Sequence, residues 1–317
     1  MSAIQDFAAA TALPPELVLK HWQGGSERNF EARYSRPWLT PESTIFAIGS
    51  CFAVNFVRWL VEQGVRTPIP SWGFHYNPMT VYEEIRQAAG GSPDALTWEL
   101  CSEAGTRYVD ARRHPVSADS LDALQQRQAQ IVAQSRACFA AADGIIITLG
   151  LSEVWEQRVH GHFRVINRIP DPAIVSKAEF RSRFLSLDEI VEQLRQLVDL
   201  IRRVKGAAIP IVFTVSPIPL KASAADMDIQ SANLRSKALL IAAVHAFLEE
   251  DTVPSRASYF PAYELVAGGP RPEAMWQRDQ RHLQAFVINR VCLEFCRLYA
   301  VAPQQFASNP HFRVPLV

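Results

Sequence analysis

The sequence predicts an α/β fold, a three-layer αβα sandwich of the flavodoxin-like kind around a mainly parallel sheet. Three apolar runs, at residues 44–48, 144–149 and 209–215, are rich in β-branched side chains and are typical of buried parallel strands. Amphipathic helical patterns separate these runs, and the most regular one covers residues 187–205. Because parallel neighbours need crossover connections, strands that alternate with helices predict a parallel sheet with helices on both faces.

The other elements follow from local patterns. Apolar side chains recur at helical spacing from Phe52 to Val61, and Gly64 is suited to end that helix. Residues 156–168 alternate around Gly161 and predict a hairpin. The remaining predicted elements are helices at 80–89, 120–141, 233–249 and 283–299, and short strands near 98–100, 107–109 and 257–260.

The length of 317 residues suffices for one large α/β domain, and neither a repeat nor a linker divides the chain. We expect an N-terminal extension at 1–43, with a short helix at 15–22, then the α/β domain at 44–300 and a C-terminal tail at 301–317.

Composition argues against several classes of partner. The formal net charge is zero and no long basic run is present, so we expect no nucleic-acid partner. No apolar run reaches the roughly 20 residues that a membrane-spanning helix needs, and the N-terminus lacks the pattern of a signal peptide. Five widely spaced cysteines do not form a disulfide framework, so the cytoplasm is the expected compartment. The sequence does not indicate an oligomeric state.

Polar turns follow the three buried strands. The first strand is followed by Gly49-Ser50-Cys51, the second by the turn from Gly150 to Glu153, and the third by Ser216. Ligands of open α/β sheets bind outside the carboxyl ends of the strands. We therefore expect these turns to share one edge of the sheet and to form a binding site there.

Cys51 stands where a strand ends and a helix begins. The free N–H groups and partial positive charge of a helix N-terminus favour a reactive thiolate and stabilise an oxyanion. The neighbouring hydroxyl of Ser50 is an alternative nucleophile or a helix cap. A buried, unreactive Cys51 is the remaining alternative.

The second candidate pair is Asp279 and His282, just before the last predicted helix. An Asp three residues ahead of a His can accept a hydrogen bond from the imidazole and direct the other ring nitrogen toward a nucleophile. A capping Asp and a surface His would give the same pattern.

Five spaced motifs together resemble the GSCFA-domain family. They are Ile48-Gly49-Ser50-Cys51-Phe52-Ala53, Gly73-Phe74-His75-Tyr76-Asn77-Pro78, Thr148-Leu149-Gly150-Leu151-Ser152-Glu153-Val154-Trp155, Thr214-Val215-Ser216-Pro217 and the segment from Asp279 to His282. That family in turn is similar to the SGNH (GDSL-type) hydrolases, which have an αβα fold and hydrolyse or transfer ester-linked acyl groups. This resemblance implies a nucleophile at Cys51 and a base at His282 that Asp279 orients.

The same resemblance implies the oxyanion and substrate-binding residues. Gly73 corresponds to the glycine N–H donor, with Asn77 as a possible side-chain donor. Gly150 and Ser152 correspond to the block that supplies an asparagine donor in the hydrolases. His75 either lines the pocket or forms hydrogen bonds within its loop, and Glu153 is a pocket acid or an orienting group.

We therefore expect an acyl-group hydrolase or acyltransferase that acts on an ester or thioester of a small molecule or glycan. The alternatives are an esterase with Ser50 as nucleophile and a non-catalytic binding protein of the same fold. No cofactor is expected, apart from a thioester acyl donor such as coenzyme A. No metal site is expected either, because His160 and His162 fit a surface turn. Lys237 is expected on a solvated helix face, with contact to a donor phosphate as the alternative.

Overall fold

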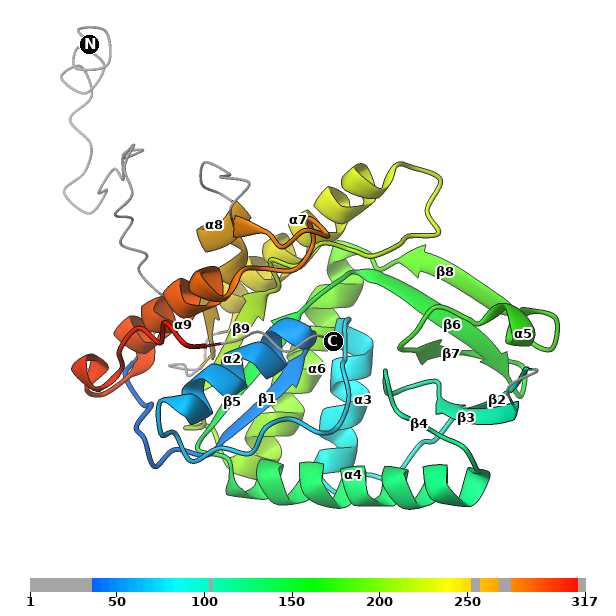
Figure 1. Cartoon of the computed structure of the whole chain (residues 1–317), viewed down its shortest axis with the longest axis horizontal. Helices are drawn as coiled ribbons and strands as arrows, with labels where there is room; N and C mark the ends of the chain where they lie inside the picture. Colours follow the sequence, from blue (N-terminus) through cyan, green and yellow to red (C-terminus); the bar gives the residue numbers. More distant parts are fainter. Residues whose placement is uncertain (1–35, 103–104, 252–256, 268–274, 313–317) are drawn as a thin grey trace, which may run out of the picture. The chain divides into compact units, whose positions relative to one another are not determined.

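A four-stranded parallel sheet lies at the centre of the fold (Figure 1). The computed structural model describes residues 36–102, 105–251, 257–267 and 275–312, which all belong to one compact unit. The strands lie in the order β1 (Ile45–Gly49), β5 (Gly144–Leu149), β9 (Ile211–Val215) and β10 (Ala257–Phe260). Each neighbouring pair is parallel, as the sequence predicted. The predicted helix at 15–22 lies outside the described residues.

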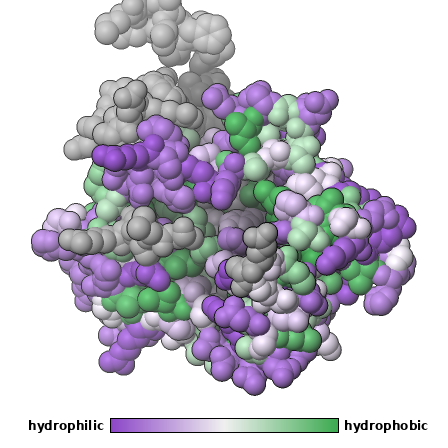
Figure 2. All heavy atoms as spheres, turned by 45° about the vertical axis from the view of Figure 1, so that its right-hand side comes forward, coloured by the Kyte–Doolittle hydropathy of each residue, from purple (hydrophilic) through white to green (hydrophobic). Residues whose placement is uncertain are grey.

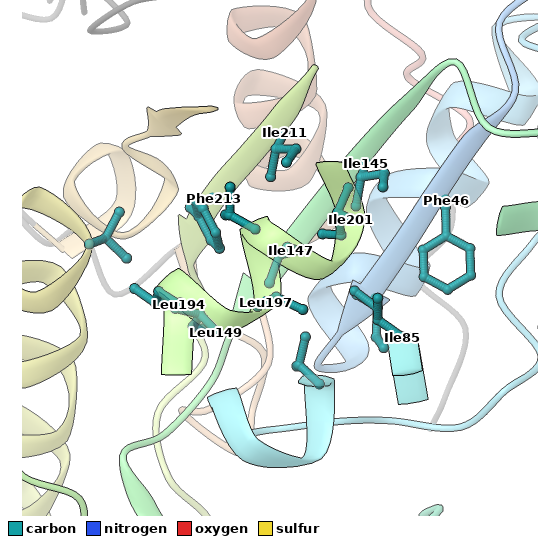
Figure 3. Packing of buried hydrophobic residues seen from close by; sticks show 14 of the residues in the cluster. Phe46, Ile85, Ile145, Ile147, Leu149, Leu194, Leu197, Ile201, Ile211 and Phe213 are labelled. Atoms are coloured by element: carbon teal, nitrogen blue, oxygen red, sulfur yellow. The ribbon is translucent and has the colours of Figure 1, made fainter. Parts of the chain in front are cut away.

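Helices cover both faces of this sheet. Phe46 and Ile48 of β1 pack in one hydrophobic cluster, whereas Ile45 and Ala47 pack in another. Side chains that alternate along a strand point to opposite faces, so each cluster marks one face. The first face carries α3 (Pro78–Ala88), α4 (Leu121–Ala141), α6 (Leu187–Lys205) and α7 (Ile229–Glu250), and Figure 3 shows part of its packing. The second carries α2 (Cys51–Glu62), α8 (Ala262–Ala267) and α9 (Ala285–Tyr299). The predicted α/β fold with helices on both faces of the sheet is confirmed.

Helix α6 shows how the sequence sets an element. Ser186 and Glu189 form a reciprocal capping box at its start, and Gly206, with φ of 88°, follows its end. Its buried face carries Leu194, Leu197 and Ile201 in the first core cluster. Burial of each such side chain contributes roughly 1.5–3 kcal/mol. The structure confirms both predicted ends of this helix.

Two small antiparallel sheets lie beside the main one. The first contains β2 (Thr97–Ser102), β3 (Gly105–Asp110) and β4 (Ser117–Ala118), and the second β6 (Glu153–Val159), β7 (His162–Ile166) and β8 (Phe180–Phe184). The Nε1–H of Trp98 donates to Oε1 of Gln157 at 2.8 Å and joins the two sheets, and α5 (Pro172–Val175) packs near them. His160 and Gly161 both have positive φ and form the tight turn of the predicted hairpin.

The end of the described chain packs on the second face. After α9, a short 3₁₀ helix η2 (Pro303–Gln305) leads to Phe306 and Phe312, which are buried in the same cluster as α2 and α9. Hydrophilic residues predominate on the molecular face in Figure 2, and hydrophobic ones lie there in small separate groups. None of the helices in the described ranges is long and apolar enough to cross a membrane.

Candidate active site

A pocket of about 860 Å³ opens where β1, β5 and β9 end. Its lining includes Cys51, Gly150 and Ser216, one from each of the polar turns that follow these strands, and also Asp279 and His282. The ends of these strands and the distant Asp-x-x-His segment therefore meet at one pocket, as the sequence predicted. The two small sheets supply an apolar wall that includes Trp98, Leu100, Trp155 and Ile166.

Cys51 is the first residue of α2 and is buried, with 6% of its surface exposed. Burial raises the pKa of its thiol, although the Arg281 charge, the N–H groups of Cys51 and Phe52, and the Lys237 charge oppose this effect. The expected lowering of the pKa at the helix N-terminus is thus outweighed by desolvation. Cys51 is a protonated thiol at neutral pH and needs a base to become a nucleophile.

Ser50 caps α2 and also lines the pocket. Its hydroxyl accepts a hydrogen bond from the N–H of Phe52 at 3.3 Å and donates one to the hydroxyl of Ser216 at 3.2 Å. Ser50 is therefore a helix cap, which was one of its two predicted roles. Its single O–H already donates to Ser216, so this bond must break before Ser50 can give up its proton to a base.

Asp279 and His282 form the predicted pair. Nδ1 of His282 bonds Oδ2 of Asp279, and Oδ1 of Asp279 accepts from the N–H groups of His282 and Arg281, each at 3.0 Å. The bond from the His282 N–H, assisted by the imidazole and by the Arg281 N–H, lowers the pKa of Asp279 to about 2. An ionised Asp279 keeps the proton on Nδ1 and leaves Nε2 as the basic nitrogen.

Arg281 occupies the other side of the imidazole. Its Nη1 lies 3.4 Å from Nε2 of His282, and its Nε–H donates to the carbonyl oxygen of Pro219 at 3.1 Å. Within the described residues, Cys51 and His282 line the same pocket without a direct hydrogen bond between them. Nε2 must exchange its contact with Arg281 for one with the thiol before it can accept that proton.

Asn77 presents an amide to the pocket. Its Oδ1 accepts from the N–H of Thr80 at 3.0 Å and so caps α3. This bond fixes the side chain, while Nδ2 donates no hydrogen bond to the described part of the chain. Within the described ranges, Nδ2 of Asn77 and the N–H of Cys51, which donates to no other residue, are therefore two donors available to a ligand.

The GSCFA family model matches residues 44–295, about four-fifths of the chain. This chain belongs to the GSCFA family. No curated protein and no solved structure matches it. The matched region contains Ser50, Cys51, Asn77, Asp279 and His282, so the whole candidate centre lies within the family region of this GSCFA protein.

Two predicted oxyanion residues do not reach the pocket. Ser152 is fully buried, its N–H donates to the Ser236 hydroxyl at 2.8 Å, and its own hydroxyl lies 3.4 Å from that oxygen. Gly73 is absent from the pocket lining and instead packs against the backbone of His114. Ser152 is therefore not placed to act as the predicted donor, because packing directs it toward Ser236. The donor role of Gly73 stays a prediction.

Gly150 lines the pocket but its backbone groups are already bonded. Its N–H donates to the carbonyl oxygen of Tyr76 at 2.8 Å, and its own carbonyl accepts from Nζ of Lys237 at 2.5 Å. Lys237 is fully buried beneath the pocket, so its predicted solvated position is wrong. Burial lowers the pKa of Lys237 to about 7. In this GSCFA chain, Lys237 fixes the Gly150 turn and places a titratable amine near the thiol.

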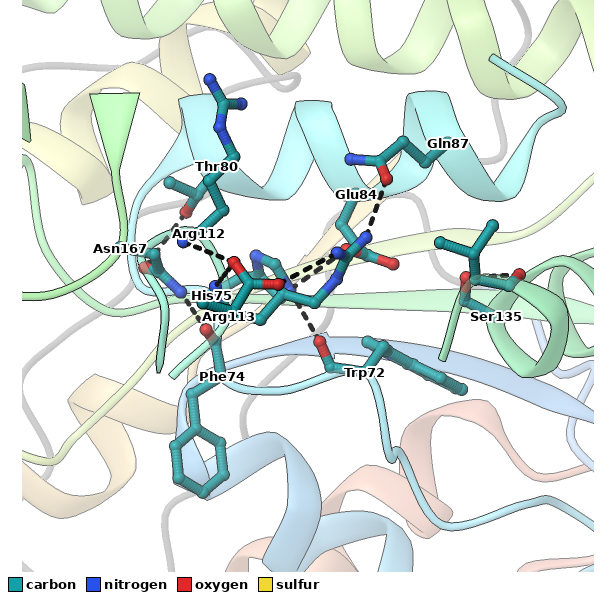
Figure 4. Close-up of polar contacts among 12 residues, drawn as sticks. Trp72, Phe74, His75, Thr80, Glu84, Gln87, Arg112, Arg113, Ser135 and Asn167 are labelled. Carbon is teal, nitrogen blue, oxygen red and sulfur yellow. Dashed lines mark hydrogen bonds and ion pairs between the residues drawn. The ribbon is translucent and has the colours of Figure 1, made fainter. Parts of the chain in front are cut away.

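His75 lies in a buried polar network behind the pocket (Figure 4). Its Nε2–H donates to the carbonyl oxygen of Trp72 at 3.1 Å, which confirms the alternative of a hydrogen bond within the loop. Burial, with the nearby Arg113 charge, lowers the pKa of His75 to about 3. Arg113 bonds Glu84 at 2.7 Å and Gln87 at 2.8 Å. The network supports the loop that leads to Asn77, and none of these four side chains belongs to the described pocket lining.

Glu153 is an acid of the pocket lining whose carboxylate two neighbouring segments hold in place. Its Oε1 accepts from the Ser182 hydroxyl at 2.6 Å and from the N–H of Ala224 at 2.9 Å. It thereby ties β8 to the loop after β9.

Within the described ranges, no group of three or more His, Cys, Asp or Glu side chains is placed to bind a metal ion.

Sequence reasoning missed several pocket residues. Asn167 donates through its amide to the carbonyl oxygen of Phe74 and accepts from the N–H of Tyr76 at 3.2 Å, so it holds the loop before α3. The Tyr76 hydroxyl lies 3.3 Å from Nδ1 of His114, which also lines the pocket. Arg168 follows Asn167 in the lining. No motif marked Asn167, His114 or Arg168, whereas Tyr76 and Arg281 stood inside two of the motifs without a predicted role.

Proposed function

We propose that this GSCFA protein is an acyl-transfer enzyme that forms a thioester between Cys51 and the acyl group of an ester or thioester substrate. The observation that carries the proposal is the shared pocket: a thiol at a strand-to-helix turn and an Asp-oriented imidazole line one cavity although they come from distant parts of the chain.

The first half-reaction begins with proton transfer. Nε2 of His282 accepts the thiol proton as Sγ of Cys51 attacks the substrate carbonyl carbon. Because the thiol is buried with a raised pKa, this step needs the base that Asp279 orients. The oxyanion accepts hydrogen bonds from the N–H of Cys51 and from Nδ2 of Asn77.

The tetrahedral intermediate that this attack forms then collapses, and its bond to the leaving group breaks. The imidazolium of His282 gives its proton to the departing alkoxide or thiolate, and the acyl group remains on Sγ. In the second half-reaction His282 removes a proton from a water molecule or a hydroxyl acceptor, which attacks the thioester and restores the thiol. Water gives a hydrolase and an acceptor alcohol gives a transferase.

The proposal predicts that Cys51→Ala lowers the rate of p-nitrophenyl acetate hydrolysis at least about 10³-fold, because the nucleophile is lost. His282→Ala should lower it about 10²–10⁴-fold. Mass spectrometry of the wild-type protein quenched during turnover should find the acyl group on Cys51. Cys101→Ala, which changes an exposed cysteine outside the pocket, is the matched control and should retain full activity.

The variant Ser50→Ala tests whether Ser50, rather than Cys51, is the nucleophile. We expect this variant to keep most of the activity and to lose about 1 kcal/mol of stability through the missing helix cap. If Ser50→Ala were inactive while Cys51→Ala retained full activity, the nucleophile would be Ser50. If neither variant changed the rate, the non-catalytic alternative would replace this proposal.

A further inference from the structure

Arg168 is a cation of the pocket lining that has no partner in the part of the chain that the structure describes. It follows β7 and lines the cavity together with Ile166 and Ile169 of the same segment. Among the described residues it forms no ion pair and no hydrogen bond, and its Nε is hidden from solvent without an acceptor. A buried guanidinium N–H that lacks an acceptor is unfavourable, so this arrangement favours a ligand that supplies one.

In the described structure no acid of the pocket forms an ion pair or a hydrogen bond with Arg168, although the charges of Asp110 and Asp171 act on it through space. Protein donors are bonded to each of the pocket acids instead. Glu153 accepts from Ser182 and Ala224, and Asp279 accepts from His282. Asp171 caps α5 by accepting from the N–H of Ala173 at 2.9 Å.

The other two cations of the described pocket lining are Arg281, which is hydrogen-bonded to the protein, and Lys221, which solvent can reach. Arg281 donates to Pro219 and His282. Lys221 is exposed and, like Arg168, lies close enough to His114 to lower its pKa. Burial, followed by these two charges, lowers the pKa of His114 to about 4, so this side chain is neutral at pH 7. The region around Arg168 therefore carries positive charge that no carboxylate of the described chain binds directly.

An apolar surface adjoins this charge. Trp98, Leu100 and Trp155 of the small sheets line the pocket with Ile166 and Ile169. A ligand that fits both surfaces has a hydrocarbon part and an anionic oxygen group. The planar guanidinium of arginine suits carboxylate and phosphate groups, which it binds through two parallel N–H donors.

We propose that Arg168 is a specificity-determining residue that binds a carboxylate or phosphate group of the substrate, while the apolar wall holds the adjoining carbon chain. This inference rests on the proposed acyl-transfer function and names its substrate class as an anionic acyl ester or thioester.

The test is a ligand-observed NMR titration with three probes of equal chain length: hexanoate, monohexyl phosphate and the neutral hexanamide. We expect at least one anionic probe to bind about tenfold or more tightly than hexanamide, as a charged hydrogen bond allows. Arg168→Gln should abolish this preference, and Arg168→Lys should retain part of it. Comparison of the two anions tells a carboxylate-bearing substrate from a phosphate-bearing one.

Arg107→Gln is the matched control. Arg107 is an exposed arginine close enough to Arg168 to lower its pKa, but it donates to Ser117 and does not line the pocket. It should keep the anion preference. Equal binding of all three probes, no binding of either anion, or an unchanged preference in Arg168→Gln would overturn the proposal.

Because none of the probes is turned over, the titration gives an answer even if Cys51 has no catalytic role. Conversely, a catalytic Cys51 with no anion preference would leave the acyl-transfer proposal in place and remove only this one.

Discussion

At the scale of a single residue, the glycine that ends β1 allows the Cys51 thiol to lie at the edge of the sheet. Gly49 ends β1 with φ of 143°, a conformation that side-chain-bearing residues rarely adopt. A Cβ on this residue would lie 2.2 Å from the carbonyl oxygen of Thr148 in the neighbouring strand. The glycine before Ser50 and Cys51 therefore lets the chain turn from β1 into α2 while it remains close to β5.

We predict that Gly49→Ala lowers the free energy of unfolding by about 3 kcal/mol or more, because backbone strain and a clash with backbone atoms combine. Gly64→Ala is the matched control: Gly64 also has positive φ, 89°, but no atom lies within 4 Å of the added Cβ. The free energy of unfolding of Gly64→Ala should fall by only about 1 kcal/mol. Urea unfolding of both variants measures the difference, and equal losses would contradict the role of the close approach.

At the scale of elements, a buried ion-pair network joins α3 to the chain after β3. Arg113 is 2% exposed and contacts Glu84 of α3 at 2.7 Å and Asp110 at 3.4 Å. Asp110 also accepts from Gln128 of α4 at 2.8 Å. The loop that carries Asn77 enters α3 directly, so this network sets the position of a candidate oxyanion donor.

Arg113→Met should lower the free energy of unfolding by about 3–5 kcal/mol, because it leaves two buried carboxylates without their cation. Arg86→Met removes a surface pair between Arg86 and Glu83 on the same helix and should lower it by less than about 1 kcal/mol. Thermal or urea unfolding compares the two variants. A similar small loss in both would show that the buried network does not stabilise this region.

At the scale of the whole molecule, folding buries histidines that remain neutral. The pKa of His75 falls to about 3 and that of His114 to about 4, in both cases first because of burial. Their ordinary value in an unfolded chain is about 6.5. Between this value and the folded values the unfolded chain binds more protons, so stability is lost as the pH falls below about 6.5.

The free energy of unfolding should therefore decrease from pH 7 to pH 5 in the wild-type protein and decrease less in His75→Gln. Glutamine can still donate to the carbonyl oxygen of Trp72 but does not titrate. Urea unfolding at several pH values measures both slopes. Identical slopes would show that His75 is not buried as a neutral group in the folded protein.

Local patterns in the sequence were enough to determine the main elements and part of the candidate site. The apolar runs became β1, β5 and β9, and capping residues placed both ends of α6. Cys51 at a strand-to-helix turn and the pair of Asp279 and His282 depend on short-range geometry, which sequence spacing largely specifies. Parallel strands share an edge, so their meeting in one pocket followed as well.

Only the tertiary structure decided the surroundings of each polar group. Packing buried Lys237, turned Ser152 toward Ser236 and raised the pKa of the Cys51 thiol. It also left Nε of Arg168 without an acceptor among the described residues. The physical reason is that desolvation and hydrogen-bond partners come from elements far apart along the chain. Spacing within one segment specifies which way its backbone runs, whereas the solvent exposure of a side chain depends on what packs against it.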